Sequence, residues 1–400
     1  MKFLRNQLDK VKHQFEKGGK LEKYFYAYEA LDTFLFAPNT TNGEKGAQIR
    51  DAIDLKRLMM TVILAMMPCL IFGIWNVGHQ HFMAIGQTGA TLGEKFWIGA
   101  IQVLPIVVIS YGVGLGIEFV FAILRKHPVN EGYLVTGMLI PLVMPPDIPL
   151  WQVAVATAFA VIIGKEAFGG TGMNVVNIAL TARAFLYFAY PTDISGSVWT
   201  YLCDAQTVAG YSGATPLALA AEAATTGENV VASFNSFGAG WNDGVFTLSN
   251  LFMGIRPGSI GETSTLMCLI GALVLIGTGA GSWKIIVSVF GGAYAMGLFL
   301  NLVGGNAFVE MPAHYHLVIG GLAFGAVFMA TDPVTASQTE TGKWIYGFLI
   351  GLFTVLIRVF NPAYPEGIML AILLMNVFAP LIDYFVVSAN KKRRLQRATV

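Results

Sequence analysis

Ten apolar segments of spanning or near-spanning length, five in each half of the chain, constrain the fold more than any other feature. Only 12% of the 400 residues are charged, whereas roughly 25% is usual in a soluble domain. The chain is therefore expected to be an all-α, polytopic membrane protein without a nucleic-acid partner. The segments lie at about 58–78, 97–124, 133–144, 150–163, 174–190, 263–280, 285–303, 316–331, 344–358 and 367–388.

Three of these segments are short for a membrane span. A full span needs ~20 apolar residues, so the third, fourth and eighth segments fall below that length, and Pro141, Pro145, Pro146 and Pro149 interrupt the third and its exit. Broken or re-entrant helices are expected there, because lipid does not tolerate freed backbone groups unless protein or a cavity covers them.

The distribution of positive charge predicts the orientation. Of the 25 Lys and Arg residues, 21 fall on one side of the spans, so this side is expected to be cytoplasmic. The expected order is a cytoplasmic segment 1–57, a first repeat 58–190, an extracytoplasmic loop 191–261, a second repeat 262–390 and a basic cytoplasmic tail 391–400. The first segment shows no signal-peptide pattern. Its aromatic run at 23–36 fits either a surface-lying amphipathic helix or a small packed helix.

The two halves share short phrases. Residues 144–147 (MPPD) match 329–332 (MATD) at a shift of 185, and 177–179 (NIA) match 361–363 (NPA) at a shift of 184. Because each half has an odd number of spans, a duplicated half must be inverted, which predicts two inverted five-helix repeats with a site between them. Urea and ammonium transporters share this plan, so a passive channel is an alternative, and chance matching of short strings is another.

Four carboxylates lie in or next to the apolar segments: Glu118, Glu166, Asp332 and Asp383. Such groups mark ion or proton pathways by default. Pairing with Lys165 or the basic tail, or simple solvation, would also explain Glu166 and Asp383. Glu118 is the hardest to explain structurally. Carboxylate oxygens suit sodium, although the sequence does not separate sodium from protons.

Two glycine-rich turns are candidate binding sites. In residues 168–174 (FGGTGMN), Gly170 and Gly172 let a ring or an anion approach the backbone, and Asn174 and Asn177 lie on one helix face. Packing of helices at glycine is the alternative. In residues 257–264 (PGSIGETS), Gly258 and Ser259 either hold a phosphate or belong to a plain N-cap.

A third short turn stands in the long weakly hydrophobic interval. Residues 210–216 read Gly-Tyr-Ser-Gly-Ala-Thr-Pro, in which Gly213 and Ala214 leave the hydroxyl of Thr215 uncluttered and Pro216 stiffens the exit. An ordinary turn is the alternative. The cysteines Cys69, Cys203 and Cys268 have no metal-site spacing, so they are expected to be packing residues and no metal site is predicted.

Taken together, these motifs resemble a known family along nearly the whole chain: the B subunits of bacterial sodium-translocating NADH:quinone oxidoreductases. The matching stretches are 15–20 (FEKGGK), 129–132 (VNEG), 165–172 (KEAFGGTG), 212–215 (SGAT), 257–262 (PGSIGE), 330–333 (ATDP) and 361–367 (NPAYPEG). The series in this order is more specific than any one member.

The resemblance implies two flavins. FMN would be joined to Thr215 through a phosphoester, within the motif that also contains Ser212, Gly213 and Ala214. A non-covalent riboflavin would be bound by residues matching Asn174 and Asn177. Electrons would pass from the FMN of the C subunit through these flavins to ubiquinone, so no general base is expected, because the cofactor carries the chemistry.

The resemblance also implies partners and an ion route. The chain would lie in the bacterial inner membrane with subunits A, C, D, E and F, and sodium transfer would involve Glu118, Asp332 and Asp383. A Gly-Gly pair linked to quinone binding falls at Gly114-Leu115, where the second glycine is replaced. The D subunit of the Rnf complex, which also has a Thr-linked FMN, is the alternative within the same class of electron-transfer proteins, and a urea or ammonium channel is the alternative without flavin.

Overall fold

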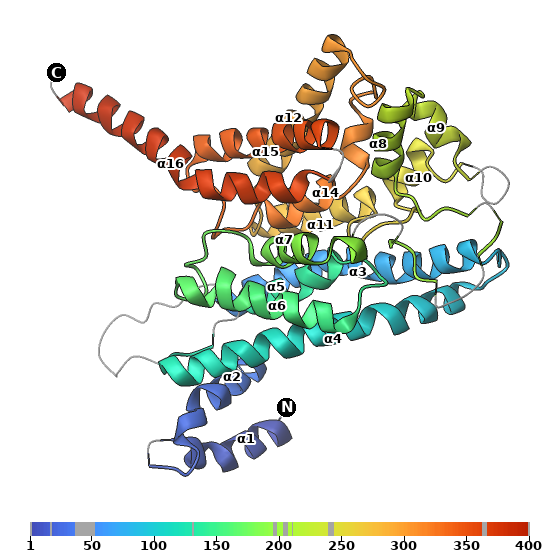
Figure 1. The fold of residues 1–400 in the computed structure, drawn as a ribbon. Coiled ribbons are helices and arrows are strands. Elements are labelled where there is room, and N and C mark those ends of the chain that lie inside the picture. The colour runs from blue at the N-terminus through green and yellow to red at the C-terminus, as the bar shows by residue number, and fades with distance from the viewer. Residues whose placement is uncertain are drawn as a thin grey trace.

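The computed structural model describes residues 2–16, 18–36, 53–129, 132–194, 198–202, 207–209, 211–238, 244–361 and 366–398. Within these ranges every regular element is a helix and there is no β-strand, which confirms the all-α expectation. Figure 1 shows most of the long helices running side by side in an elongated bundle. Predictions that rest on Lys17, Asn130, Glu131, Cys203, Gly210 and residues 362–365 lie outside the described ranges.

The first half of the bundle matches the five predicted segments closely. Its helices are α3 (Leu55–Ala84), α4 (Leu92–Arg125), α5 (Gly132–Leu142), α6 (Leu150–Gly164) and α7 (Ile178–Ala189). Local caps set their starts: Thr91 and Glu94 form a capping box that opens α4. The side chain of Asn177 caps α7, so this helix begins at residue 178 and not at 174 as predicted.

The second half follows the predicted segments with one interruption. Its elements are α11 (Thr265–Thr278), α12 (Trp283–Val303), α13 (Tyr315–Val318), α14 (Leu322–Phe324), the π-helix η4 (Gly325–Met329), α15 (Glu340–Phe360) and α16 (Ile368–Ala398). The eighth segment is therefore broken once, at residues 319–321 between α13 and α14, as its length predicted; α14 runs directly into η4. The fourth is not broken, because α6 and the 3-10 turn η2 (Glu166–Phe168) form one continuous stretch of 19 residues.

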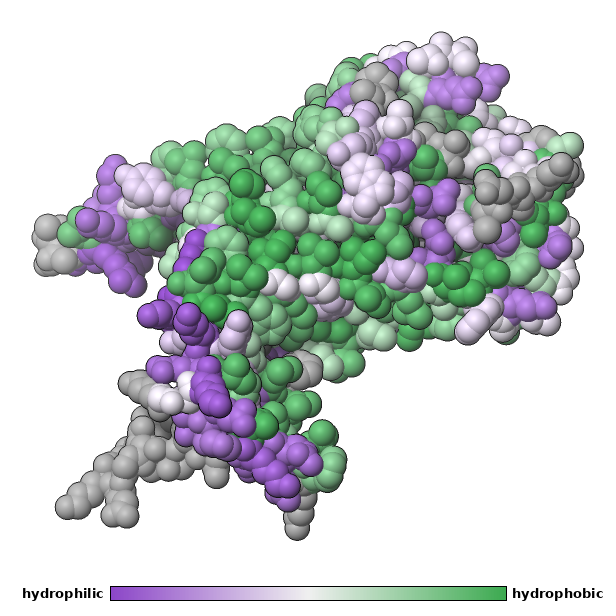
Figure 2. Space-filling view, turned by 60° about the horizontal axis from the view of Figure 1, so that its bottom comes forward, coloured by the Kyte–Doolittle hydropathy of each residue, from purple (hydrophilic) through white to green (hydrophobic). Residues whose placement is uncertain are grey.

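Six helices of the described chain are long and apolar enough to cross a membrane: α3, α4, α6 with η2, α12, α15 and α16. The helices α5, α7 and α11 are apolar but shorter. Figure 2 shows a broad hydrophobic surface that separates hydrophilic side chains at two ends of the molecule. This surface and the helix lengths are those of a multi-pass membrane protein.

The polar elements lie at the two ends of the bundle. Helices α1 (Lys2–Phe15) and α2 (Phe25–Leu35), joined by the turn η1 (Glu22–Tyr24), form a hairpin that includes an Arg5–Asp32 ion pair of 2.7 Å. This hairpin and the end of α16 lie toward the left of Figure 1, whereas α8 (Pro216–Thr226), α9 (Val230–Ser236) and α10 (Leu248–Met253) lie at the right end. The short turn η3 (Pro191–Asp193) leads out of α7 toward them.

The two halves share one hydrophobic core. It contains buried side chains of α3, α5, α6 and α7 together with those of α11, η4, α15 and α16. Cys69 of α3 and Cys268 of α11 meet inside this core with their Sγ atoms 3.8 Å apart, in keeping with the packing role expected for them. A second cluster joins α8, α9 and α10 to α12 and α15, which ties the polar end to the bundle.

Close approach of α12 and α15 depends on glycine. A Cβ added at Gly292 would lie 2.1 Å from the carbonyl oxygen of Phe348, whereas one added at the neighbouring Gly291 would meet nothing within 4 Å. We expect Gly292→Leu to lower the free energy of unfolding by about 1–3 kcal/mol through overpacking. Thermal unfolding of the purified protein checks this, with Gly291→Leu as the matched control. Equal losses in both variants would contradict the assigned packing role.

Candidate functional site

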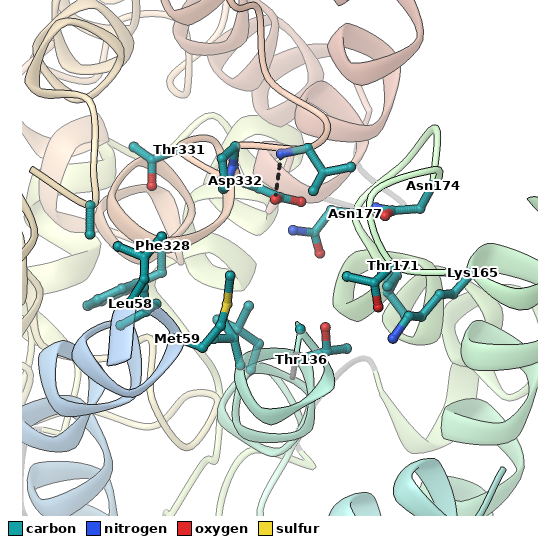
Figure 3. Close-up of a pocket in the computed structure, with 18 of the residues that line it drawn as sticks. Leu58, Met59, Thr136, Lys165, Thr171, Asn174, Asn177, Phe328, Thr331 and Asp332 are labelled. Carbon is teal, nitrogen blue, oxygen red and sulfur yellow. Dashed lines mark hydrogen bonds between the residues drawn. The ribbon is translucent and has the colours of Figure 1, made fainter. Parts of the chain in front are cut away.

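A cavity lies between the two halves of the bundle, at the end that carries the hairpin and the tail. The space free of protein atoms there, with the adjoining open solvent included, is about 850 Å³. Figure 3 shows polar side chains from the α6–α7 connection on one side and the exit of η4 on the other. The polar residues of the lining are Thr136, Lys165, Thr171, Asn174, Asn177, Thr331 and Asp332.

The connection between α6 and α7 depends on glycines with positive φ. Gly170 has φ +99° and Gly172 has φ +89°, values that L-residues with a side chain rarely adopt. These two glycines bend the chain so that Thr171, Asn174 and Asn177 all line the cavity. The sequence analysis singled out both glycines because they would let a ligand approach the backbone. In the structure it is the neighbouring side chains that line the cavity.

The amides of this connection are held in place by short-range hydrogen bonds. Asn177 Oδ1 accepts from Leu180 N–H at 3.2 Å, which leaves its amide nitrogen toward the cavity (Figure 3). Asn174 Nδ2 donates to the Val176 carbonyl at 3.1 Å. Thr171 Oγ1 is buried and finds no hydrogen-bond partner among the described residues. Buried polar atoms are normally paired, so Thr171 and Asn177 leave hydrogen-bonding capacity for a ligand.

Asp332 stands on the opposite wall, at the exit of η4. Its carboxylate accepts from the Val334 N–H at 3.1 Å and from the Thr335 hydroxyl at 3.0 Å. Burial raises the pKa of this carboxyl above its ordinary value, and the two hydrogen bonds oppose that rise. The structure thus brings Asp332 to the same cavity as the two asparagines (Figure 3).

Glu118 of α4 is buried and forms an ion pair with Lys165, the first residue after α6. Because Lys165 and Glu166 are neighbours in the sequence, Lys165 was a candidate partner of Glu166. In the structure Glu166 pairs instead with Arg125 at 3.1 Å. Since Lys165 also lines the cavity, it connects Glu118 to that space. Sequence reasoning missed this role of Lys165; the signal was a basic residue next to an acidic one at the end of an apolar segment.

The remaining predicted ion and quinone residues lie away from the cavity lining. Asp383 of α16 accepts from the Ser337 and Thr339 hydroxyls, each at 2.6 Å, and not from the basic tail. Gly114 is buried where α4 meets Tyr133, whose hydroxyl oxygen would lie 1.8 Å from an added Cβ. Leu115 beside it is half-buried.

Thr215 lies at the opposite end of the bundle, as the N-cap of α8. Its Oγ1 accepts from the Ala218 N–H at 3.2 Å, and Ser212 Oγ accepts from the Ala214 N–H at 3.3 Å. Gly213 is buried, while Ser212 is exposed and Thr215 is half-buried. The turn that the sequence singled out is therefore also the start of a helix of 11 residues.

The turn at 257–264 is occupied by protein groups. Ser259 Oγ donates to Glu262 at 2.5 Å, and Glu262 pairs with Arg183 of α7 at 2.7 Å. The N-cap of α11 is Ser264, whose side chain accepts from the Met267 N–H, and not Ser259. Ser259 thus belongs to a buried ionic cluster between the halves, whose second carboxylate is that of Glu366, also bonded to Arg183. Gly258 lies beside Thr263, whose Cγ2 would be 2.9 Å from an added Cβ.

Known proteins match this chain along most of its length. The family model described as NQR2, RnfD, RnfE matches residues 43–392. The chain belongs to this family. Among its curated relatives, the B subunits of the Na(+)-translocating NADH-quinone reductases of Ectopseudomonas mendocina and Azotobacter vinelandii are each 49% identical, over 98% of this chain and 99% of their own lengths. The B subunit of the same name from Chromohalobacter salexigens is 48% identical, over 98% of this chain and 96% of its own.

Membership of the NQR2, RnfD, RnfE family confirms the resemblance drawn from the motifs. The match covers both halves of the bundle and the long interval that contains Thr215, so it concerns the whole architecture and not one motif. The relatives named above are subunits of a multisubunit enzyme by their names.

Proposed function

We propose that the chain is a membrane redox subunit of a sodium-pumping NADH:quinone oxidoreductase, with riboflavin in the cavity and FMN on Thr215. The observation that carries the proposal is the cavity between the halves, with hydrogen-bonding capacity concentrated on the side formed by Thr171, Asn174 and Asn177. The names of relatives at 49% identity support the overall reaction. Electrons would arrive from the flavin of the C subunit and leave to ubiquinone.

The cavity suits a flat ring with one polar edge. Val62, Leu139 and Phe328 supply apolar walls, and the amides of Asn174 and Asn177 face the same space. A typical small-molecule pocket has this composition, with few polar groups that fix orientation. A bound flavin supplies electron-transfer chemistry, while these residues would orient its ring, pair with its polar edge and keep water from it.

The position of Thr215 supports a phosphoester there. Its Oγ1 uses one lone pair as the cap of α8, and an attached phosphate would lie at the positive end of that helix, where Pro216 has no N–H and that of Ala218 donates to Oγ1. A phosphodiester carries negative charge, so the helix start would stabilise it. Ser212, Gly213 and Ala214 would shape the approach to this hydroxyl.

The packing pattern supports two inverted five-helix repeats. In the first half, α6 packs against α4 and α7, and in the second half α15 packs against α12 and α16. The short helix α5 of the first half in turn contacts α7, the last helix of that half, and η4 of the second half contacts α16. The similar order of helix contacts in the two halves supports the duplication that the matching sequence phrases suggested.

Orientation and partners follow from charge and family. We place both termini in the cytoplasm and Thr215 in the periplasm, because the basic hairpin and tail lie at the end opposite α8–α10 (Figure 1). The exposed apolar side chains would contact lipid or subunits A, C, D, E and F of an inner-membrane complex. Sodium would pass near Glu118, Asp332 and Asp383, and quinone near Gly114 and Leu115.

The test of the cavity is Asn177→Ala. We expect this variant to retain non-covalent flavin about tenfold less tightly, because a buried hydrogen-bonding group is lost from the ligand's side of the pocket. Flavin released by acid from the purified complex and separated by chromatography measures the content.

Asn229→Ala is the matched control, because Asn229 caps α9 as Asn177 caps α7 but lies outside the cavity lining. A full flavin complement in Asn177→Ala would contradict the assignment of Asn177 to the flavin site. Absence of any flavin from the wild-type complex would instead favour the channel alternative.

A further inference from the structure

Lys165 is a buried cation that contacts both the cavity and a buried carboxylate. Its side chain is 2% exposed, and the Glu118 side chain with which it pairs is 4% exposed. In Figure 3 its Nζ atom lies at the cavity edge near Thr136 and Thr171. One ammonium group is thus shared between the space proposed for riboflavin and a carboxylate of α4.

Besides Lys165, the charged or titratable groups that act on Glu118 are Glu166 and His127. The neighbouring acid, Glu166, is bonded to Arg125 through both its carboxylate and its carbonyl oxygen. The Tyr133 ring lies 5.9 Å from Lys165 Nζ and carries no charge. Glu118 therefore provides the carboxylate that neutralises Lys165, so whatever binds Glu118 controls how much positive charge Lys165 presents to the cavity.

Burying an ion pair is costly relative to an apolar pair of the same volume, so its stability alone is a weak reason for it. Ionisable groups at membrane depth are functional by default. The position of Lys165 between an acid and a ligand cavity supplies a function that a purely packing pair would not have.

We propose that Lys165 couples cation binding at Glu118 to the reduction of the flavin held in the cavity. The inference rests on the proposed function. A monovalent cation on the Glu118 carboxylate competes with Lys165 for the same oxygens, and the released ammonium then raises the positive charge at the cavity. Reduction adds negative charge to a flavin, so cation binding and flavin reduction favour each other, and linkage makes the effect reciprocal.

The test is a redox titration of the non-covalent flavin in the purified complex at pH 7, taken as the difference from an Asn177→Ala complex washed until its non-covalent flavin is gone. Glu118→Gln leaves Lys165 without its counter-charge, so the potential must rise. Lys165→Met leaves the carboxylate, so the potential must fall. We expect each shift to be about tenfold in the reduction equilibrium, which for a two-electron couple is about 30 mV. The double variant must fall between the two single variants.

Sodium supplies the second measurement. Added Na⁺ must raise the potential in the wild type and leave it unchanged in Glu118→Gln. Arg125→Gln, which breaks the neighbouring ion pair, is the control and must keep the response to Na⁺. If the Lys165→Met complex loses its flavin, Glu118→Gln alone tests the coupling: its reduction potential must be higher than that of the wild type and must not respond to Na⁺.

The outcomes separate this inference from the function on which it rests. Shifts of the same sign in both single variants, or a sodium response that survives in Glu118→Gln, overturn the coupling while the flavin site stands. A wild-type complex without non-covalent flavin overturns both.

Discussion

Thr215→Ala is expected to abolish covalent flavin on this chain completely. In a host that has the flavin transferase, the wild-type band fluoresces in a denaturing gel and the variant band is dark. The reason is chemical: Thr215 provides the hydroxyl at the start of α8, and alanine offers no oxygen to esterify. The helix should survive, since loss of an N-cap costs only about 1 kcal/mol.

Thr247→Ala is the matched control for this experiment. Thr247 caps α10 with the same geometry, its Oγ1 accepting from the Asn250 N–H at 3.4 Å, as Thr215 does for α8. The control must remain fluorescent. A fluorescent Thr215→Ala band would place the flavin elsewhere, and a dark wild-type band would remove the covalent flavin from the proposal.

Arg183→Met is expected to be the most destabilising single change in the bundle. Arg183 of α7 binds Glu262 at the start of the second half and Glu366 before α16, and it is 1% exposed. Removing it takes away the guanidinium that both carboxylates bond directly in a buried site. Breaking a buried ion pair in this way costs about 3–5 kcal/mol, whereas the intact pair contributes much less than that.

Thermal unfolding of the detergent-purified complex measures the loss. Lys284→Met is the control, because Lys284 pairs with Glu340 on the surface, where the two side chains are 27% and 65% exposed. It should change the unfolding temperature little. Adding Glu262→Gln and Glu366→Gln to Arg183→Met should recover part of the stability. Equal behaviour of Arg183→Met and Lys284→Met would contradict the assigned role.

The ionic cluster around Arg183 explains why the halves of the bundle hold together at a fixed geometry. Arg358 of α15 adds to it by donating to the carbonyl oxygens of His316 and Ile319, which stabilises the broken element of the second half. Arg256 does the same for Thr263 and Gly320. Backbone carbonyl groups freed by the break between α13 and α14 are therefore satisfied by buried arginines, as membrane-embedded chains require.

Hydropathy by itself determined the helical class, the approximate bounds of the apolar helices and the break in the eighth segment. These features depend on local composition, because a long apolar run must pair its backbone within itself in lipid. Local sequence also identified the turn before α8 and the glycines at 170 and 172, since backbone conformation there is set by the residues themselves. The fourth segment was expected to be broken, but η2 extends it.

Only the tertiary structure decided which charges meet. Glu118 and Lys165 are separated by 47 residues, and Arg183 and Glu366 by 183, so no local pattern pairs them. The sequence accordingly offered Lys165 as a partner of Glu166 and treated Ser259 as a plain N-cap or a phosphate ligand. Burial reverses such expectations, because a charge removed from water must find its counter-charge wherever the fold brings one close. The cavity and its link to Glu118 exist for the same reason: they arise where two distant halves pack together.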